Sequence, residues 1–516
     1  MEAFGSLIDG FAVALTWTNI LYLFIGAFLG SLVGVLPGIG PSAGMVLLLP
    51  LTFTLEPATA IIMLCGVYYG AMFGGSTSAI LLNVPGESSS VMTAIEGHPL
   101  AKQGRGGVAL GMSAVSSFIA GTLAVIGLMF LAIPMTKLAL ALGSAETAAL
   151  IFAILTLLAG LSGSTLLKGL AIGALGLVLA TIGAEPLSAQ TRLHFDLMTL
   201  QPGISFIAAG IGLFGLPEVI ETIQKPVASA MQKGSVKLRD VFPGLQDYKD
   251  SITAFPNGFL VGFTFGALPG LSGNVGQFVV QAIQKRISKK PELFDGNGSI
   301  EAVAAIEGAN NASAIGSLVP MLTIGIPGTG AAAVLMGAMI VHGLQPGPLL
   351  FQSRPDVAWG LIASMHLGNL MLLILNMPLI GIWISIMRVP THIIMVAVLA
   401  LCVAGIYSVE NSMGNVYVMF AFGILGYFMR KLGFPVAPVI LTLLLSAMLE
   451  TSLHRALLIS AGDWTVFVAS PMSASFVAIA VLSILLQIPA ISRRLSKLIR
   501  IGGKSMDRGK IIIDND

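Results

Sequence analysis

Long apolar runs, separated by short polar segments, dominate the pattern of this chain. A membrane-spanning helix needs about 20 predominantly apolar residues, and the runs that meet this need in full or in part predict about 11 to 14 membrane segments, some of them short or broken. These runs are 18–36, 58–82, 108–133, 145–161, 166–184, 204–216, 255–268, 300–324, 357–387, 392–407, 413–428, 434–449 and 472–490.

Two polar segments interrupt this pattern and predict how the chain is organised. Residues 221–254 are charged, so we expect a first membrane repeat half over 1–220, a polar connecting loop over 221–254 and a second membrane repeat half over 255–491. Residues 492–516 carry many Lys and Arg side chains. Because basic segments favour the cytoplasmic side, we expect these residues to form a cytoplasmic tail.

The composition supports a membrane protein. Of 516 residues, 55% are hydrophobic and 10% are charged, whereas a soluble domain carries about 25% charged residues. The expected fold class is therefore an all-α polytopic membrane protein. The net charge of +2 comes without a basic patch interleaved with aromatic residues, so nucleic acid is not an expected partner. Cys65 and Cys402 lie far apart in apolar runs and predict neither a disulfide nor a metal site.

Two motifs occur twice. The segment GVLPGIGPSAG at 34–44 has a counterpart in GALPGLSGNVG at 266–276, an offset of 232 residues. The segment SAILLNVPGESS at 78–89 has a counterpart in PMLTIGIPGTGA at 320–331, an offset of 242. The second copy has therefore gained ten residues, which we assign to the loop 284–298.

The loop charges predict that the two copies are inserted in opposite senses. Residues 52–58 carry one acid and no base, while the matching 284–290 carry four bases. Residues 97–107 carry two bases, while the later 343–353 carry none. Since bases mark the cytoplasmic side, this reversal is typical of the inverted-topology repeats of secondary transporters.

The Pro-Gly motifs predict broken helices. Non-helical backbone survives at membrane depth only where it lines a cavity or is buried in protein, so matched breaks in both halves point to a substrate site. Hydroxyls, amides and helix ends near the breaks could bind an anion. The alternatives are helix kinks and small polar residues at helix–helix contacts. The candidate substrate-binding residues are Gly38, Ser76, Thr77, Ser78, Asn83, Pro85, Gly86, Ser88, Gly270, Asn274, Asn310, Asn311, Thr323, Pro327, Gly328 and Thr329.

Three glutamates near the motifs are candidates for a coupling ion or a proton. They are Glu87, Glu96 and Glu307. An acid within a membrane segment often relays a proton or pairs with an ion, although each could equally be a hydrogen-bonded structural glutamate. The sequence contains no GxSxG, Walker, HExxH or CxxC motif, so we expect no catalytic residue, no metal and no cofactor other than Na⁺ or H⁺ as coupling ion.

Several long stretches resemble one transporter family. They include GVLPGIGPSAGMVLLLPLTF at 34–53, YYGAMFGGSTSAILLNVPGESSSVMTAIEGHPLAKQGRGGVAL at 68–110, and AIEGANNASAIGSLVPMLTIGIPGTGAAAVLMGAMIVHGLQPGPLLF at 305–351. With these residues the chain resembles the large transmembrane subunit, TctA type, of the tripartite tricarboxylate transporter family. It departs from that family's pattern at EGHP, 96–99, and at EPLSAQTRLHFD, 185–196.

The resemblance implies a secondary active importer in the bacterial inner membrane. From the two inverted repeats we expect it to work by alternating access around a site at the repeat interface. Its implied partners are a small membrane subunit (TctB type) and a periplasmic solute-binding protein (TctC type). Its implied substrates are carboxylates such as citrate and other tricarboxylates, dicarboxylates or aromatic acids, driven by a Na⁺ or H⁺ gradient. The alternatives are a stand-alone carboxylate symporter that needs no binding protein and, from another class, an intramembrane enzyme.

Overall fold

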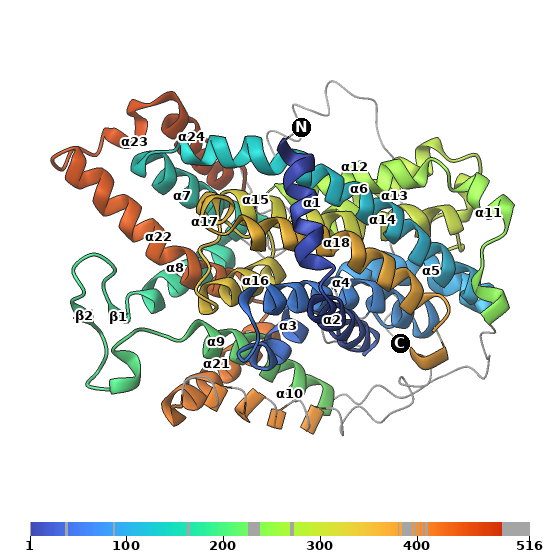
Figure 1. Cartoon of the computed structure of the whole chain (residues 1–516), viewed down its shortest axis with the longest axis horizontal. Helices are drawn as coiled ribbons and strands as arrows, with labels where there is room; N and C mark the ends of the chain where they lie inside the picture. The colour runs from blue at the N-terminus through green and yellow to red at the C-terminus, as the bar shows by residue number, and fades with distance from the viewer. Residues whose placement is uncertain are drawn as a thin grey trace.

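The computed structural model of the chain consists almost entirely of α-helices (Figure 1). It describes residues 2–36, 40–85, 88–161, 166–224, 238–268, 273–379, 381–383, 395–396, 399–400, 402–404, 406–407 and 411–487. Within these residues one small sheet occurs, in which β1 (Gly183–Ala184) pairs antiparallel with β2 (Thr191–Arg192). The predicted all-α polytopic membrane class is confirmed.

The helices of the first half run in sequence from the N-terminus. They are α1 (Glu2–Ala14), α2 (Trp17–Val35), α3 (Pro41–Leu48), α4 (Pro57–Leu82), α5 (Val91–Lys102), α6 (Gly106–Leu140), α7 (Ser144–Leu161), α8 (Leu166–Ala180), α9 (Phe206–Gly210) and α10 (Leu216–Gln224). A π-helical turn, Ile211–Gly215, joins α9 to α10.

The helices of the connecting segment and the second half follow. They are α11 (Leu245–Asp250), α12 (Ala254–Ala267), α13 (Gly273–Ile287), α14 (Ile300–Gly316), α15 (Leu318–Thr323), α16 (Gly330–Val341), α17 (Pro348–Ser353), α18 (Pro355–Asn376), α21 (Met413–Lys431), α22 (Ala437–Ile459), α23 (Val466–Ala469) and α24 (Pro471–Gln487). The predicted basic tail 492–516 lies outside the described residues.

The lengths of the helices separate full spans from broken ones. In the described part of the chain, five helices are long and apolar enough to cross a membrane: α2, α4, α6, α18 and the 438–459 portion of α22. The apolar run 300–324 is divided instead into α14 and α15 at Ser317. At 1.5 Å per residue, the 17 residues of α14 reach only about 25 Å, less than the hydrocarbon thickness of about 30 Å.

Glycines bring α2 and α4 into direct backbone contact. A Cβ atom added to Gly26, Gly30 or Gly34 on α2 would lie 2.1, 2.3 or 2.2 Å from a carbonyl oxygen of α4. Any side chain larger than hydrogen would therefore force the two helices apart. Small residues at regular spacing are the usual basis of close helix packing in membranes, where lipid is as apolar as the side chains.

The same contact recurs between α12 and α14. A Cβ on Gly258, Gly262 or Gly266 would lie 2.9, 2.3 or 2.2 Å from a carbonyl oxygen of α14. These glycines follow Gly26, Gly30 and Gly34 by 232 residues, which is the offset of the first repeated motif. The repeat thus extends from sequence motifs to the packing of a helix pair, which we call the hairpin: α2–α4 in one copy, α12–α14 in the other.

The residues that these glycines contact, on α4 in one hairpin and on α14 in the other, are equally well matched. Gly30 faces Val67 and Gly262 faces Ala309, and these partners are 242 residues apart, the offset of the second motif. The opposite insertion of the two copies stays a prediction, as do the boundaries of the two halves.

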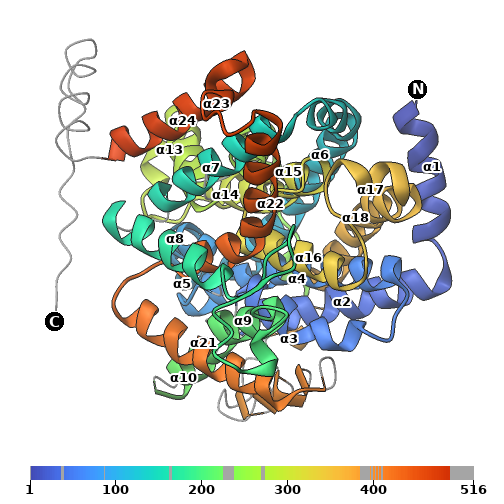
Figure 2. The same ribbon diagram turned by 90° about the vertical axis from the view of Figure 1, so that its left-hand side faces the viewer.

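Each half also supplies a long helix to the hairpin of the other half. Helix α6 packs on α14, and α18 packs on α4, while α6 and α18 touch each other. Beside α4, helix α3 contacts α16 from the second half (Figure 2). Helix α4 is buried along most of its length, and every residue of α14 is buried. The centre of the molecule is therefore built jointly by the two halves.

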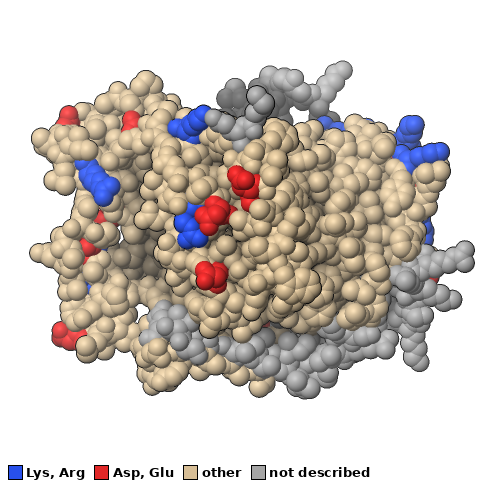
Figure 3. All heavy atoms as spheres, viewed as in Figure 1, with Lys and Arg blue, Asp and Glu red and all other residues tan. Residues whose placement is uncertain are grey.

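The outer face in Figure 3 carries few charged side chains, and most of the visible surface is uncharged. Large apolar side chains such as Phe130 on α6 and Phe152 on α7 are about half exposed. A surface of this kind is suited to lipid.

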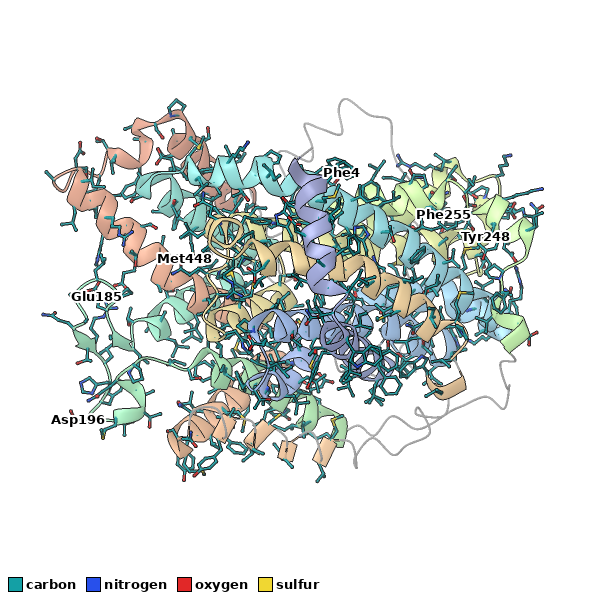
Figure 4. All side chains as sticks on the ribbon, viewed as in Figure 1. Phe4, Glu185, Asp196, Tyr248, Phe255 and Met448 are labelled. Atoms are coloured by element: carbon teal, nitrogen blue, oxygen red, sulfur yellow. The ribbon has the colours of Figure 1, made fainter. Side chains whose placement is uncertain are left out.

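The peripheral loop that contains Glu185 and Asp196 lies at the opposite end of the molecule from Tyr248 and Phe255 (Figure 4).

Candidate functional site

The predicted polar residues of the two halves lie in the central helices. Ser76, Thr77 and Ser78 are in the last two turns of α4, and Asn310 and Asn311 are in the middle of α14. All five are at most 3% exposed. These two helices contact each other, so the first copy's hydroxyls and the second copy's amides share one interior region.

The carboxylate of Glu307 is held by hydroxyls from the first half. Glu307, on α14, is 0% exposed. It accepts hydrogen bonds from Ser76 on α4, from Thr93 on α5 and, at 3.2 Å, from Ser113 on α6. We call these four residues the Glu307 cluster. It joins the buried acid of one half to three helices of the other.

Asn311 connects α14 to α6. Its Nδ2 donates to Ser117 Oγ at 2.7 Å and to the Glu307 carbonyl at 3.3 Å. Ser116, one residue earlier on α6, donates to the Ala304 carbonyl at 2.8 Å. The amide of Asn311 thus holds two helices together, which is the alternative role of a polar residue at a helix–helix contact.

Asn310 differs from its neighbour. It is 0% exposed, and neither its Nδ2 nor its Oδ1 has a hydrogen-bond partner among the described residues. Leaving a buried polar group unpaired costs about 1–3 kcal/mol. An amide whose Nδ2 donors and Oδ1 acceptor have no partner among the described residues, in the protein centre, is suited to a polar ligand.

The second break is well defined. Helix α15 ends at Thr323 and α16 begins at Gly330, with Gly325 between them at φ +84°. The hydroxyl of Thr329 caps α16 by accepting from the Ala332 N–H at 3.1 Å. Pro327, also in the break, is buried. The predicted interruption of the helix is therefore present, with the N-terminus of α16 at one side of it.

Tyr68 joins this break to α4. Its hydroxyl lies 3.3 Å from Ser317 Oγ and 3.5 Å from Thr329 Oγ1. Gly328 approaches the α12 backbone so closely that an added Cβ would lie 3.1 Å from the Gly266 carbonyl oxygen. Thr323, by contrast, donates to the Val319 carbonyl of its own helix at 2.7 Å. Its hydroxyl is occupied locally.

The first break is described in part. Helix α4 ends at Leu82, and the next residue, Asn83, is exposed and takes a left-handed conformation at φ 58°. Pro85 is partly buried, and Ser88 begins a short 3-10 turn whose first side chain is outside the described part. Ser78 donates to the Gly75 carbonyl at 3.3 Å. Because Asn83 is exposed, it is not part of the buried Glu307 cluster.

The structure does not describe the remaining candidate residues or their side chains. Gly38, Gly86, Glu87 and Gly270 lie outside the described residues. Asn274 lies at the start of α13, but its side chain is not among those described.

Glu96 lies in a separate network. Its carboxylate accepts from Gln281 Nε2 at 3.0 Å and from the Asp295 N–H at 2.9 Å, beside the Lys285–Asp295 ion pair. Burial raises the pKa of Glu96, and these hydrogen bonds oppose the shift. Lys285 in turn lowers the pKa of Asp295. Glu96 connects α5 to α13 and to the loop that follows α13.

Some residues of the site were not predicted. Thr93, Ser113, Ser117 and Tyr68 were absent from the candidates, although they contact residues that were predicted. For α6 a signal existed, since its Ser113, Ser116 and Ser117 share one helix face by their spacing of three and four residues. Nothing in the sequence distinguishes Thr93 from other threonines.

Comparison with known proteins places the chain among transporters. The sequence model described as the tripartite tricarboxylate transporter TctA family matches residues 20–441. An uncharacterized 52.8 kDa protein in the TAR-I ttuC' 3'region of Agrobacterium vitis is 40% identical over 499 residues, covering 96% of this chain and 99% of that protein. An uncharacterized protein in the TAR-II ttuC' 3'region of the same organism is 41% identical over 225 residues, 44% of this chain and 93% of that protein.

No solved structure matches the chain.

Proposed function

Because this chain belongs to the tripartite tricarboxylate transporter TctA family, we propose that it is the large permease subunit of a binding-protein-dependent, ion-gradient-driven carboxylate importer. Its substrate would be citrate or another tricarboxylate, a dicarboxylate or an aromatic acid. It would work in the bacterial inner membrane, with its C-terminal tail in the cytoplasm, beside a TctB-type membrane subunit and a TctC-type periplasmic binding protein.

The observation that carries the site assignment is the unpaired amide of Asn310 at the centre of α14. Its Nδ2 would donate to a carboxylate oxygen of the substrate, and its Oδ1 would accept from a hydroxyl or protonated carboxyl. Among the described residues, Arg and Lys make no ion pair with the Glu307 cluster. The site would therefore attract an anion through amides, hydroxyls and the N-terminus of α16 rather than through fixed cations.

The arrangement of the two halves supports alternating access. Each hairpin packs on a long helix from the other half, so the central region lies at the interface between halves. A displacement of one half relative to the other would change which side of the membrane reaches that region. Transporters built from repeats bind their substrates at such an interface.

The test is reconstituted uptake. The purified chain would be placed in proteoliposomes with and without the small membrane subunit, and the periplasmic binding protein would be added outside. Uptake of radiolabelled citrate, succinate and benzoate would be measured under a Na⁺ gradient, a proton gradient and after each gradient is dissipated. The proposal predicts uptake of at least one carboxylate that needs a gradient and both partner proteins, and needs no ATP.

The same experiment separates the alternative function. Gradient-driven uptake by this chain alone, unchanged by the two partners, would show a stand-alone symporter instead. Absence of uptake of all three acids with both partners and both gradients present would count against carboxylate transport.

A further inference from the structure

The Glu307 cluster contains a buried carboxyl group without a positively charged partner among the described residues. The carboxylate is fully buried, and the hydroxyls of Ser76, Thr93 and Ser113 converge on its two oxygens. Within the described residues, no Lys, Arg or His forms an ion pair with it. Burying an ionised carboxylate without a counter-charge costs several kcal/mol even after relaxation, and hydroxyl donors offset only part of that cost.

The donor set of the cluster indicates which ion would restore neutrality. It consists of five oxygen atoms: two from the carboxylate and one from each of the three hydroxyls. Oxygen ligands favour hard cations, whereas softer metals such as zinc and copper favour nitrogen or sulfur ligands. One negative charge is neutralised by a monovalent cation, whereas a divalent ion would leave an uncompensated positive charge in the protein interior.

We propose that the Glu307 cluster binds one Na⁺ ion. The carboxylate oxygens and the three hydroxyl oxygens would be its ligands, because each hydroxyl can rotate to present a lone pair instead of its proton. This inference rests on the proposed transport function, to which it adds the place where the coupling ion binds.

The position of the cluster explains how the ion would favour substrate. Glu307 and Asn310 are three residues apart on α14, a spacing that places their side chains on neighbouring positions of one helix face. A cation at Glu307 would therefore lie close to an anion bound by Asn310. Each would raise the affinity for the other, and this reciprocal coupling is the thermodynamic requirement of symport.

The repeat predicts that the ion binds in one hairpin only. In the register set by the matched glycine contacts, the position of Glu307 corresponds to Cys65 on α4. Cys65 is buried and adds no charge. A symmetric second ion site in the α2–α4 hairpin is therefore not expected.

The test measures Na⁺ binding without substrate. Thermal unfolding of the purified full-length chain in detergent would be followed as NaCl replaces choline chloride at constant ionic strength. A ligand that binds only the folded state raises the apparent Tm in a saturable way. The wild-type chain should show this rise with Na⁺. The rise should be lost in Glu307→Gln, which keeps the shape of the side chain and removes its charge.

Two further variants make the result specific. Ser113→Ala removes one ligand and should raise the half-saturating Na⁺ concentration by about tenfold or more, the size of effect seen when groups that support a metal site are removed. Glu301→Gln is the matched control, since Glu301 is a buried acid on the same helix but is bonded to Gln284 and Ser288. It should keep the wild-type response.

Three results would overturn the proposal. A Na⁺ response that persists in Glu307→Gln would place the ion elsewhere. A Tm that depends on pH and not on Na⁺, and loses that dependence in Glu307→Gln, would make the cluster a proton site. If Glu307→Gln does not fold, an unchanged half-saturating concentration in Ser113→Ala would reject the ligand set. Failure of carboxylate uptake with an intact Na⁺ response would reject the transport function and leave the ion site standing.

Discussion

The two hairpins share a backbone arrangement and differ in their chemistry. Both place three glycines of the first helix against carbonyl oxygens of the second helix, at matching positions. At the register where α14 carries Glu307, Asn310 and Asn311, however, α4 carries Cys65, Tyr68 and Tyr69. The close packing is repeated, and the charged and amide groups belong to one copy.

This difference shows how a symmetric scaffold can hold an asymmetric site. The first half is not inert, because its Ser76, Thr93 and Ser113 hydroxyls reach the acid of the second half, and its Tyr68 reaches the second break. The packing positions have to match for the halves to fit together. The polar positions are free to differ, since they contact the other half rather than their own counterpart.

The largest expected effect is on the shared packing. Gly30→Ala and Gly262→Ala each place a Cβ 2.3 Å from a backbone oxygen, so each should destabilise the fold by about 3 kcal/mol or more. Folded yield would be measured by size-exclusion chromatography of the detergent-solubilised chain. Gly173→Ala in α8, where an added Cβ meets nothing within 4 Å, is the control. Loss of yield in only one hairpin would show that the two contacts are not equivalent.

The next effect separates the two adjacent asparagines. Asn311→Ala removes the donor to Ser117 and to the Glu307 carbonyl, and should lower the free energy of unfolding by about 1–3 kcal/mol. Asn310→Ala breaks no hydrogen bond among the described residues and should change stability by less than about 1 kcal/mol. Thermal unfolding of the two variants side by side measures the difference. Equal destabilisation would mean that Asn310 is also a packing residue.

A smaller effect is expected where the first hairpin contacts the second break. Tyr68→Phe removes the hydroxyl near Ser317 and Thr329 and should cost about 0.5–1.5 kcal/mol of stability. Tyr417→Phe on α21 is the matched control, because Tyr417 is 68% exposed. Both variants would be compared with the wild type by thermal unfolding. An equal loss of stability in Tyr417→Phe and Tyr68→Phe would mean that the contact of the Tyr68 hydroxyl with the second break does not stabilise the fold.

The smallest effect is expected outside both hairpins. Arg105 forms an ion pair with Asp247 at 2.6 Å, with side-chain exposures of 45% and 20%. Arg105→Ala should lower stability by at most about 1 kcal/mol, and the difference should shrink at high salt because exposed ion pairs are screened. The variant and the wild type would be unfolded thermally at low and high NaCl. A loss of more than about 2 kcal/mol of stability in Arg105→Ala would contradict the expectation that this exposed ion pair contributes little to the fold.

The sequence predicted those features that leave a local signal. Composition identified the membrane class, and the repeated Pro-Gly motifs identified both offsets that the glycine contacts later show. Asn310, Asn311 and Glu307 could be proposed because amides and acids are rare in apolar helices. Ser113 could have been proposed from the spacing of the serines on α6. Thr93 could not, since a hydroxyl in a packed membrane helix looks the same whether it contacts a backbone carbonyl or a carboxylate.

Candidate residues that the sequence predicted together have different contacts in the structure, because tertiary packing decides which way each side chain points. Asn83 and Thr323 flank breaks as predicted, yet one is exposed and the other bonds to its own helix. Asn310 and Asn311 are neighbours in sequence, yet their amides have different surroundings because successive residues on a helix point about 100° apart. Which side of α14 faces α6 depends on the packing of the two halves, and a short motif does not contain that information.

The measurement that tests the central claim most directly is carboxylate uptake by Asn310→Ala in proteoliposomes that contain the partner proteins. Asn376→Ala is the control, since Asn376 is a buried asparagine on α18 whose Nδ2 bonds to the Leu372 carbonyl of its own helix, so that only its Oδ1 lacks a partner among the described residues. With equal amounts of folded protein, Asn310→Ala should lower kcat/KM by about 10- to 100-fold, the loss expected for one hydrogen bond to a charged ligand. Uptake equal to that of the wild type would contradict the assignment of the substrate site to the centre of α14.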